Sequence, residues 1–130
     1  MHPLLKTLCD DAITRPLSTE GIETFIKDCA PGLRIIFLAG DPDKKLETAD
    51  VAVVLREFTR LYPRAFEVAI GETPEAEKQA MELSGVFALP SLIFFANGKK
   101  LETLPKIQDW SVYAEALPRL IEASQTETVS

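Results

Sequence analysis

The sequence predicts an α/β fold, with a central mixed β-sheet of four to five strands flanked by helices. Three observations predict it together. A long helical pattern follows the most apolar segment of the chain, Pro90 stands immediately before a buried strand, and that strand leads through Asn97-Gly98 into a hairpin before a final helix. Apolar strands that alternate with helices are typical of parallel pairs, and the Asn-Gly turn adds an antiparallel pair.

The composition predicts one domain, which we expect over residues 1–124, followed by a polar tail over residues 125–130. The 130 residues are 46% hydrophobic and 26% charged, which is enough apolar material for one core. Acidic residues number 20 against 14 basic ones, and this balance disfavours nucleic acid and anionic membranes as partners. No apolar run predicts membrane insertion. Residues 1–6 lack the pattern of a secretory signal, so we expect a cytoplasmic protein.

The first quarter of the chain predicts two helices separated by a short extended piece. Residues 3–12 carry leucines at helical spacing. Residues 13–15 read as extended, and Pro16 prevents this piece from continuing as a central strand because proline lacks a backbone N–H. Ser18 or Thr19 then caps the second helix.

The middle of the chain predicts two inner strands. We expect Pro31-Gly32 to end the second helix, after which residues 33–39 are almost entirely apolar. A strand that is covered on both faces has this composition. A long helix then runs to Tyr62, where Pro63 stops it, and residues 65–70 form the next inner strand.

The following segment predicts a short helix and a hairpin. Thr73 is its cap, Pro74 suits its first turn, and Gly85 closes it. Residues 91–96 form a strand, and residues 99–104 return antiparallel to it.

The end of the chain predicts a last helix, which Asp109 caps and Pro118 should kink or shorten. Its spacing directs five residues inward: Trp110, Tyr113, Leu117, Leu120 and Ile121.

Residues 86–98 resemble a segment of thioredoxin, Val-x-x-x-Pro-Thr-x-x-x-Phe-x-x-Gly, with Ser91 in place of the usual threonine. The order of the elements resembles thioredoxin too. The resemblance implies a thioredoxin-like fold in which the Leu89-Pro90 bond is cis, a form that costs an X-Pro bond only about 0.5–1 kcal/mol. The local sequence fits a trans proline at the start of a strand equally well. The order of elements favours cis.

The redox chemistry of thioredoxin is missing from the place where it should lie. Dithiol exchange needs a thiolate of low pKa at a helix N-terminus and a second thiol two residues later. In this chain that position is the loop 40–45, Gly-Asp-Pro-Asp-Lys-Lys, and the only cysteines are Cys9 and Cys29. We expect these to be free, mostly buried thiols in a reducing compartment, with a disulfide between them as the alternative.

Further segments are similar to the [NiFe] uptake-hydrogenase maturation proteins of the HyaE/HupG type, and the likeness covers about Thr19 to Ile121. The segments are Gly40–Asp43, Leu55–Phe58, Phe66–Gly71 and Gly85–Pro90. The resemblance implies a cytoplasmic chaperone, without catalysis or cofactor, for the small subunit of the hydrogenase. It would bind the twin-arginine signal peptide of the small-subunit precursor before export. Other hydrogenase maturation proteins would be further partners.

Two acidic clusters are candidate sites for the arginines of such a peptide. The first surrounds the start of the long helix and consists of Asp41, Asp43, Glu47 and Asp50. A favourable interaction with the helix dipole explains these acids without a partner, and Lys44 and Lys45 weaken the negative field. The alternative is an acidic rim that makes charge-assisted hydrogen bonds to arginine. The second cluster surrounds only Lys78 and consists of Glu72, Glu75, Glu77 and Glu82.

Leu89 and Pro90 are a further candidate site, because in thioredoxin-like proteins the backbone beside the cis proline pairs with an extended peptide. A purely structural turn is the alternative. Two other functions remain open at this point: a thiol-disulfide or peroxide-handling enzyme using Cys9 or Cys29, and an interaction module without a chaperone role. The sequence has no Cys/His metal set and no phosphate loop, and His2 is its only histidine.

Overall fold

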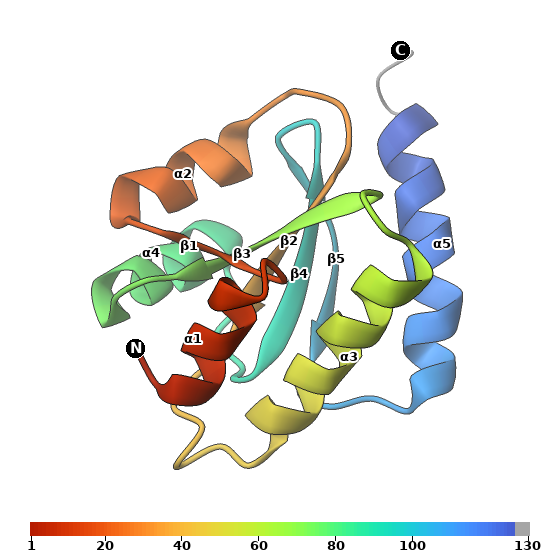
Figure 1. Cartoon of the computed structure of the whole chain (residues 1–130). Coiled ribbons are helices and arrows are strands. Elements are labelled where there is room, and N and C mark those ends of the chain that lie inside the picture. The colour runs from red at the N-terminus through yellow and green to blue at the C-terminus, as the bar shows by residue number, and fades with distance from the viewer. Residues whose placement is uncertain (127–130) are drawn as a thin grey trace.

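Five strands form one mixed sheet in the order β1-β3-β2-β4-β5 (Figure 1). The computed structural model describes residues 1–126. β3 pairs in parallel with β1 and β2, whereas β4 pairs antiparallel with β2 and β5, which confirms the predicted mixed sheet. The strands are β1 (Arg15–Leu17), β2 (Leu33–Leu38), β3 (Phe66–Gly71), β4 (Ser91–Ala96) and β5 (Lys99–Pro105).

Helices cover both faces of the sheet (Figure 1). They are α1 (Pro3–Asp10), α2 (Thr19–Lys27), α3 (Glu47–Leu61), α4 (Pro74–Ser84) and α5 (Trp110–Thr126). The side chains of β2 alternate between two cores because successive residues of a strand point to opposite faces. Ile35 and Phe37 pack with α1, α3 and α5, while Ile36 and Leu38 pack with α2 and α4. All of β2 is buried, as predicted for an inner strand.

The predicted caps of α2 and α4 are present. The Ser18 hydroxyl accepts a hydrogen bond from Gly21 N–H at 3.1 Å, and the Thr73 hydroxyl accepts one from Ala76 N–H at 3.1 Å. Gly85 ends α4 with a φ of 73°, a left-handed conformation that glycine adopts without steric cost. β1 contains Pro16 and lies at the edge of the sheet, where a missing N–H is tolerated.

The end of α2 corrects one prediction, because this helix stops at Lys27 and not at Pro31-Gly32. The carboxylate of Asp28 accepts a hydrogen bond from Ala30 N–H at 2.8 Å and lies 3.1 Å from the buried guanidinium of Arg34. This local turn competes with the next helical hydrogen bonds and takes the chain out of the helix.

α5 bears on two more expectations. Pro118 does not shorten the helix, and both Pro118 and Ala114, whose carbonyl loses its partner, are exposed to water. Trp110 packs near Phe58 but is 43% exposed, so it is only partly inward. The helix extends two residues into the predicted tail, and residues 127–130 lie outside the described part of the chain. No helix among residues 1–126 is long and apolar enough to span a bilayer.

Candidate functional site

The loop after β2 meets the turn before β4 at one edge of the sheet. β4 runs antiparallel to β2, and its first residue Ser91 lies beside Leu38, the last residue of β2. The Leu89-Pro90 bond is cis, as the sequence resemblance implied. A Cβ placed on Gly40 would lie 3.2 Å from the Cβ of Leu89, so the loop and the turn are in contact.

The start of α4 reaches the same loop from the other side. Glu77 accepts a hydrogen bond from Gly40 N–H at 3.0 Å. Gly71, the last residue of β3, permits this approach, because a Cβ there would lie only 2.6 Å from the backbone nitrogen of Glu77. This bond therefore connects Glu77 of the second acidic cluster to the loop that carries Asp41 and Asp43 of the first.

A cleft of about 480 Å³ lies between the loop after β2, the start of α4 and the start of α1. We call it the acidic cleft, since Asp41, Glu72 and Glu77 line it and, among residues 1–126, no lysine or arginine does. His2 closes one side: its Nδ1 accepts a hydrogen bond from Leu4 N–H, and its Nε2 lies 3.1 Å from a carboxylate oxygen of Asp43.

The structure separates the predicted acidic residues. Asp41 and Glu72 line the acidic cleft, and Asp43 adjoins it through His2. The carboxylate of Glu47 instead accepts a hydrogen bond from Ile107 N–H at 3.2 Å, in the loop between β5 and α5. Asp50 and Glu75 are exposed and do not line the cleft.

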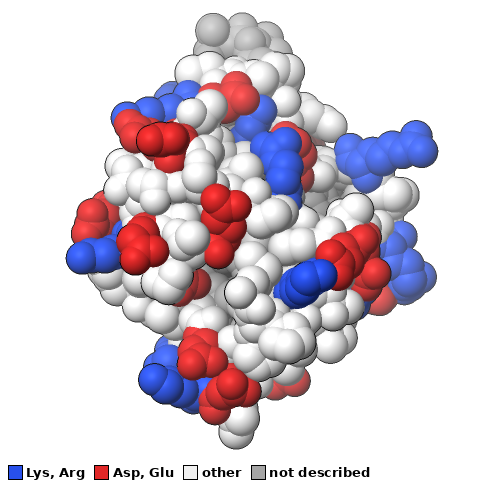
Figure 2. Space-filling view, turned by 60° about the vertical axis from the view of Figure 1, so that its left-hand side comes forward, with Lys and Arg blue, Asp and Glu red and all other residues white. Residues whose placement is uncertain are grey.

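Charges of both signs lie on the face that carries α1, α2 and α4. Figure 2 shows acidic side chains across this face, with basic ones beside them at its top, left, right and bottom. Lys44 and Lys45 follow Asp41 in the same loop, where their N–H groups donate to its backbone carbonyl. The negative field of the cleft is thus local, as the sequence indicated for a loop that mixes acids and lysines.

The ring of Tyr113 in α5 packs against the ring of Phe58 in α3, with 5.8 Å between the ring centroids. Burial raises the pKa of its phenol, and the nearby negative charge of Glu47 raises it as well, whereas a hydrogen bond from Gln108 N–H has the opposite effect on this pKa. The neutral phenol therefore accepts the Gln108 N–H at 3.1 Å and holds the loop between β5 and α5 in place.

A second cleft of about 610 Å³ lies at the opposite ends of β1 and β3. Two arginines, Arg15 and Arg64, line it together with Tyr62, Phe66 and Cys9, and we call it the arginine cleft.

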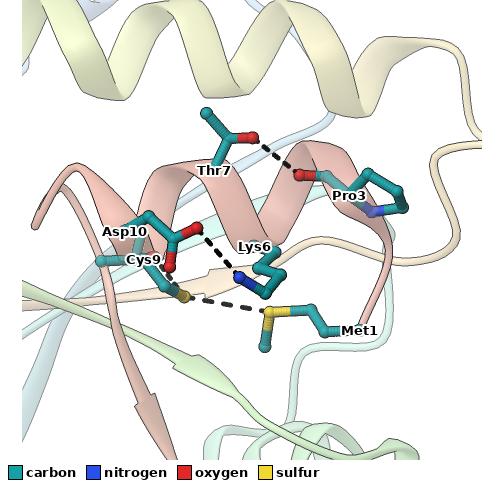
Figure 3. A network of polar contacts seen from close by, with 7 residues as sticks. Met1, Pro3, Lys6, Thr7, Cys9 and Asp10 are labelled. Carbon is teal, nitrogen blue, oxygen red and sulfur yellow. Dashed lines mark hydrogen bonds and ion pairs between the residues drawn. The ribbon is translucent and has the colours of Figure 1, made fainter.

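The two cysteines are free thiols, as expected, but the expected burial is wrong, because Cys9 is only half-buried and Cys29 is exposed. Cys9 Sγ lies 3.3 Å from the Thr14 hydroxyl and 3.8 Å from Met1 Sδ, toward which it points in Figure 3. Cys29 is exposed and lies next to Gly98. Gly98 belongs to the turn between β4 and β5, at the end of β4 that is remote from Pro90. Neither thiol lies in the loop after β2, which is where the sequence resemblance implied the thioredoxin cysteines would be.

A family model described as "Hydrogenase-1 expression protein HyaE" matches residues 4–113. The chain belongs to the HyaE family. The hydrogenase expression/formation protein HoxO of Azotobacter vinelandii is 30% identical over 121 residues, which are 93% of this chain and 79% of that relative. HupG of Bradyrhizobium diazoefficiens is 35% identical over 106 residues, covering 79% and 69% of the two chains. HupG of Rhodobacter capsulatus is 36% identical over 94 residues, covering 72% and 67%.

Solved structures similar to this HyaE family member are thioredoxins. Thioredoxin of Fasciola hepatica matches with a TM-score of 0.61 and 14% identity, over 78% of this chain and 93% of its own. Thioredoxin O2 of Arabidopsis thaliana, in its oxidized state, matches with a TM-score of 0.62 and 15% identity, over 81% and 92%. This likeness confirms the predicted thioredoxin-like fold. The family and its relatives' names confirm the predicted relation to hydrogenase maturation.

Two contacts of this HyaE family site were not predicted. The first is the Glu77 bond to Gly40, for which Gly71, two residues before the Thr73 cap, was the available sign of a close approach. The second is Lys106, whose Nζ donates to the carbonyl of Leu89 at 2.8 Å. Nothing in the local sequence indicates it.

Proposed function

We propose that this HyaE family protein is a cytoplasmic chaperone of [NiFe] hydrogenase maturation that binds the twin-arginine signal peptide of the small-subunit precursor. The observation that carries the proposal is the acidic cleft, directly beside the Leu89-Pro90 turn. Asp41, Glu72 and Glu77 line it, and no lysine or arginine of the described part of the chain does. A guanidinium group has five N–H donors in a planar fork, which matches paired carboxylates.

The neighbouring turn suits the rest of the peptide. The backbone beside a cis proline pairs with an extended chain in thioredoxin-like proteins. Main-chain hydrogen bonds of this kind form with peptides of many different sequences. Leu89 is half-buried and Pro90 is buried, so the backbone at this turn is held in place by the core. The cleft would select the arginines, and the turn would hold the residues that follow.

We also propose that the protein acts without catalysis. The loop after β2 holds Asp41 and Pro42 where a reactive thiol would be needed, and the free thiols of Cys9 and Cys29 lie elsewhere. The relatives are named expression/formation proteins, which agrees with an accessory role.

The test is a titration of a fluorescent signal peptide into the purified protein at low and at physiological salt. We expect binding that weakens as salt rises, because exposed charges are screened over about 8–10 Å at 0.1–0.15 M salt. A peptide with Lys-Lys in place of Arg-Arg should bind several-fold more weakly, since lysine lacks the bidentate geometry. Absence of binding at low salt would contradict the proposal.

A second titration separates a chaperone of the precursor from a general interaction module. The small subunit is offered once with its signal peptide and once without it. The proposal expects capture of the first only, and equal capture of both forms would favour the interaction module.

A further inference from the structure

Lys106 occupies the carbonyl that an added strand would use. Its Nζ donates to the carbonyl oxygen of Leu89 at 2.8 Å, immediately before the cis proline. In residues 1–126 the N–H of Leu89 donates to no acceptor. The N–H of Leu89 can therefore donate a hydrogen bond to a peptide carbonyl, while the carbonyl of Leu89 is already bonded to the Lys106 side chain.

The backbone holds Lys106 at this place. Its N–H donates to the carbonyl of Pro90 at 2.7 Å, and the next N–H, that of Ile107, donates to Glu47 at 3.2 Å. Lys106 has a φ of 59°, which is uncommon for a residue other than glycine or asparagine. Such conformations persist where the surroundings impose them, and they gather at functional sites.

Exposed apolar side chains stand on both segments that meet at this carbonyl. Phe87, two residues before Leu89, is 66% exposed, and Ile107, next to Lys106, is 37% exposed. Large exposed apolar side chains beside an open backbone edge suit a peptide that continues as an apolar run after its charged residues.

Building on the proposed function, we infer that Lys106 is an internal competitor of the bound peptide. It holds the Leu89 carbonyl in the free protein and leaves it when a peptide adds as a strand at this turn. The ammonium group is exposed, so it returns to water on release. The affinity for the peptide is therefore lower than it would be if the Leu89 carbonyl had no internal partner. The strength of the Lys106 hydrogen bond determines the size of this reduction.

The test compares the affinity of three variants for the signal peptide. Lys106→Met keeps the apolar stem and removes the donor, and we expect it to bind about 3- to 10-fold more tightly, because no hydrogen bond of a charged group has to be broken. Lys99→Met is the matched control, since it removes the same charge from an exposed site at the hairpin end of β5, away from Pro90 and the acidic cleft. Lys106→Arg keeps a cationic donor and should bind like the wild type.

An equal gain for Lys106→Met and Lys99→Met would overturn the inference, because the effect would then be one of net charge. Hydrogen exchange supplies a second measurement: the N–H of Leu89 should exchange more slowly once the peptide is bound. Binding without that protection would overturn the inference and leave the proposed function standing. If neither the wild type nor Lys106→Met binds the peptide, the proposed function fails and the inference fails with it.

Discussion

The acidic cleft and the arginine cleft are similar in volume, about 480 Å³ and about 610 Å³. They differ in the charge of the side chains that line them and in their place in the sheet. The acidic cleft lies where β2 and β3 end and the cis-proline turn begins, while the larger arginine cleft lies where β1 and β3 start. In open α/β sheets the carboxyl ends of parallel strands are the usual ligand site. Position in the sheet and charge thus identify the candidate site, and size does not.

The charges in the two clefts are also satisfied differently. Arg15 of the arginine cleft lies 3.5 Å from the carboxylate of Glu67 and covers the ring of Phe25 at 5.7 Å, so its charge has partners within the protein. In the acidic cleft, Glu77 and Asp41 accept hydrogen bonds from the backbone N–H groups of Gly40 and Asp43. These donors orient the carboxylates without neutralising them, which leaves the negative charge for a cationic partner.

The largest effect should come from Gly71→Ala, which attacks the wall of the acidic cleft. The new Cβ would lie 2.6 Å from the backbone nitrogen of Glu77, and backbone cannot move aside as a flexible side chain can. We expect a loss of about 1–3 kcal/mol in the free energy of unfolding, measured by denaturant titration. The melting temperature should fall by about 4–12 °C.

Gly21→Ala is the matched control for that change. A Cβ there would lie 3.2 Å from a side-chain atom of Leu17, and the position is inside α2, where alanine is favoured over glycine by up to about 1 kcal/mol. A loss for Gly21→Ala as large as the loss for Gly71→Ala would show that the close approach of β3 and α4 is not the cause.

The next largest effect should come from reversing charges in the acidic cleft. We expect Asp41→Lys with Glu72→Lys to weaken signal-peptide binding by about tenfold or more, because arginine would lose two carboxylates and meet two ammonium groups. The control is Glu20→Lys with Glu122→Lys, which changes the net charge equally at exposed positions of α2 and α5. Equal loss in both double variants, measured by fluorescence titration, would mean that only net charge matters.

Much of this comparison was predictable from sequence because local signals specify it. The apolar run of β2, the Asn97-Gly98 turn with φ values of 55° and 76°, and the cis Leu89-Pro90 bond each follow from a few adjacent residues or from a segment resemblance. The loop after β2 was identified in the same way, as the place where thioredoxin carries its cysteines.

The contacts that complete the site were not predictable, because they join distant parts of the chain. The Gly40–Glu77 bond spans 37 positions, and the Lys106–Leu89 bond spans 17. Each depends on how closely two elements approach in the folded protein, which periodicity and capping rules do not give. The same limit explains Glu47, whose partner Ile107 lies 60 positions away and draws it from the cluster in which the sequence placed it.

A smaller effect is expected for Glu77, where two substitutions separate its two roles. Glu77→Gln keeps an oxygen that can accept the Gly40 N–H, so the free energy of unfolding should change little while peptide binding weakens by about threefold. Glu77→Ala removes the acceptor as well and should also destabilise the fold by about 0.5–1.5 kcal/mol. If both variants bind like the wild type, the charge of Glu77 takes no part in recognition.

The smallest effect is expected from replacing the two cysteines, Cys9 in the arginine cleft and Cys29 outside it. These substitutions test whether the protein is a thiol enzyme. Cys9 Sγ contacts the Thr14 hydroxyl and Met1 Sδ, and Cys29 lies beside the turn at the far end of β4. Cys9→Ser and Cys29→Ser should therefore bind the signal peptide within about twofold of the wild type, because neither removes a charge or a contact of the acidic cleft. Insulin reduction measured on all three proteins should stay at the uncatalysed rate. A wild-type rate above that level that either serine substitution abolishes would show that the thiols have a catalytic function. The acidic cleft would then no longer be the preferred functional site.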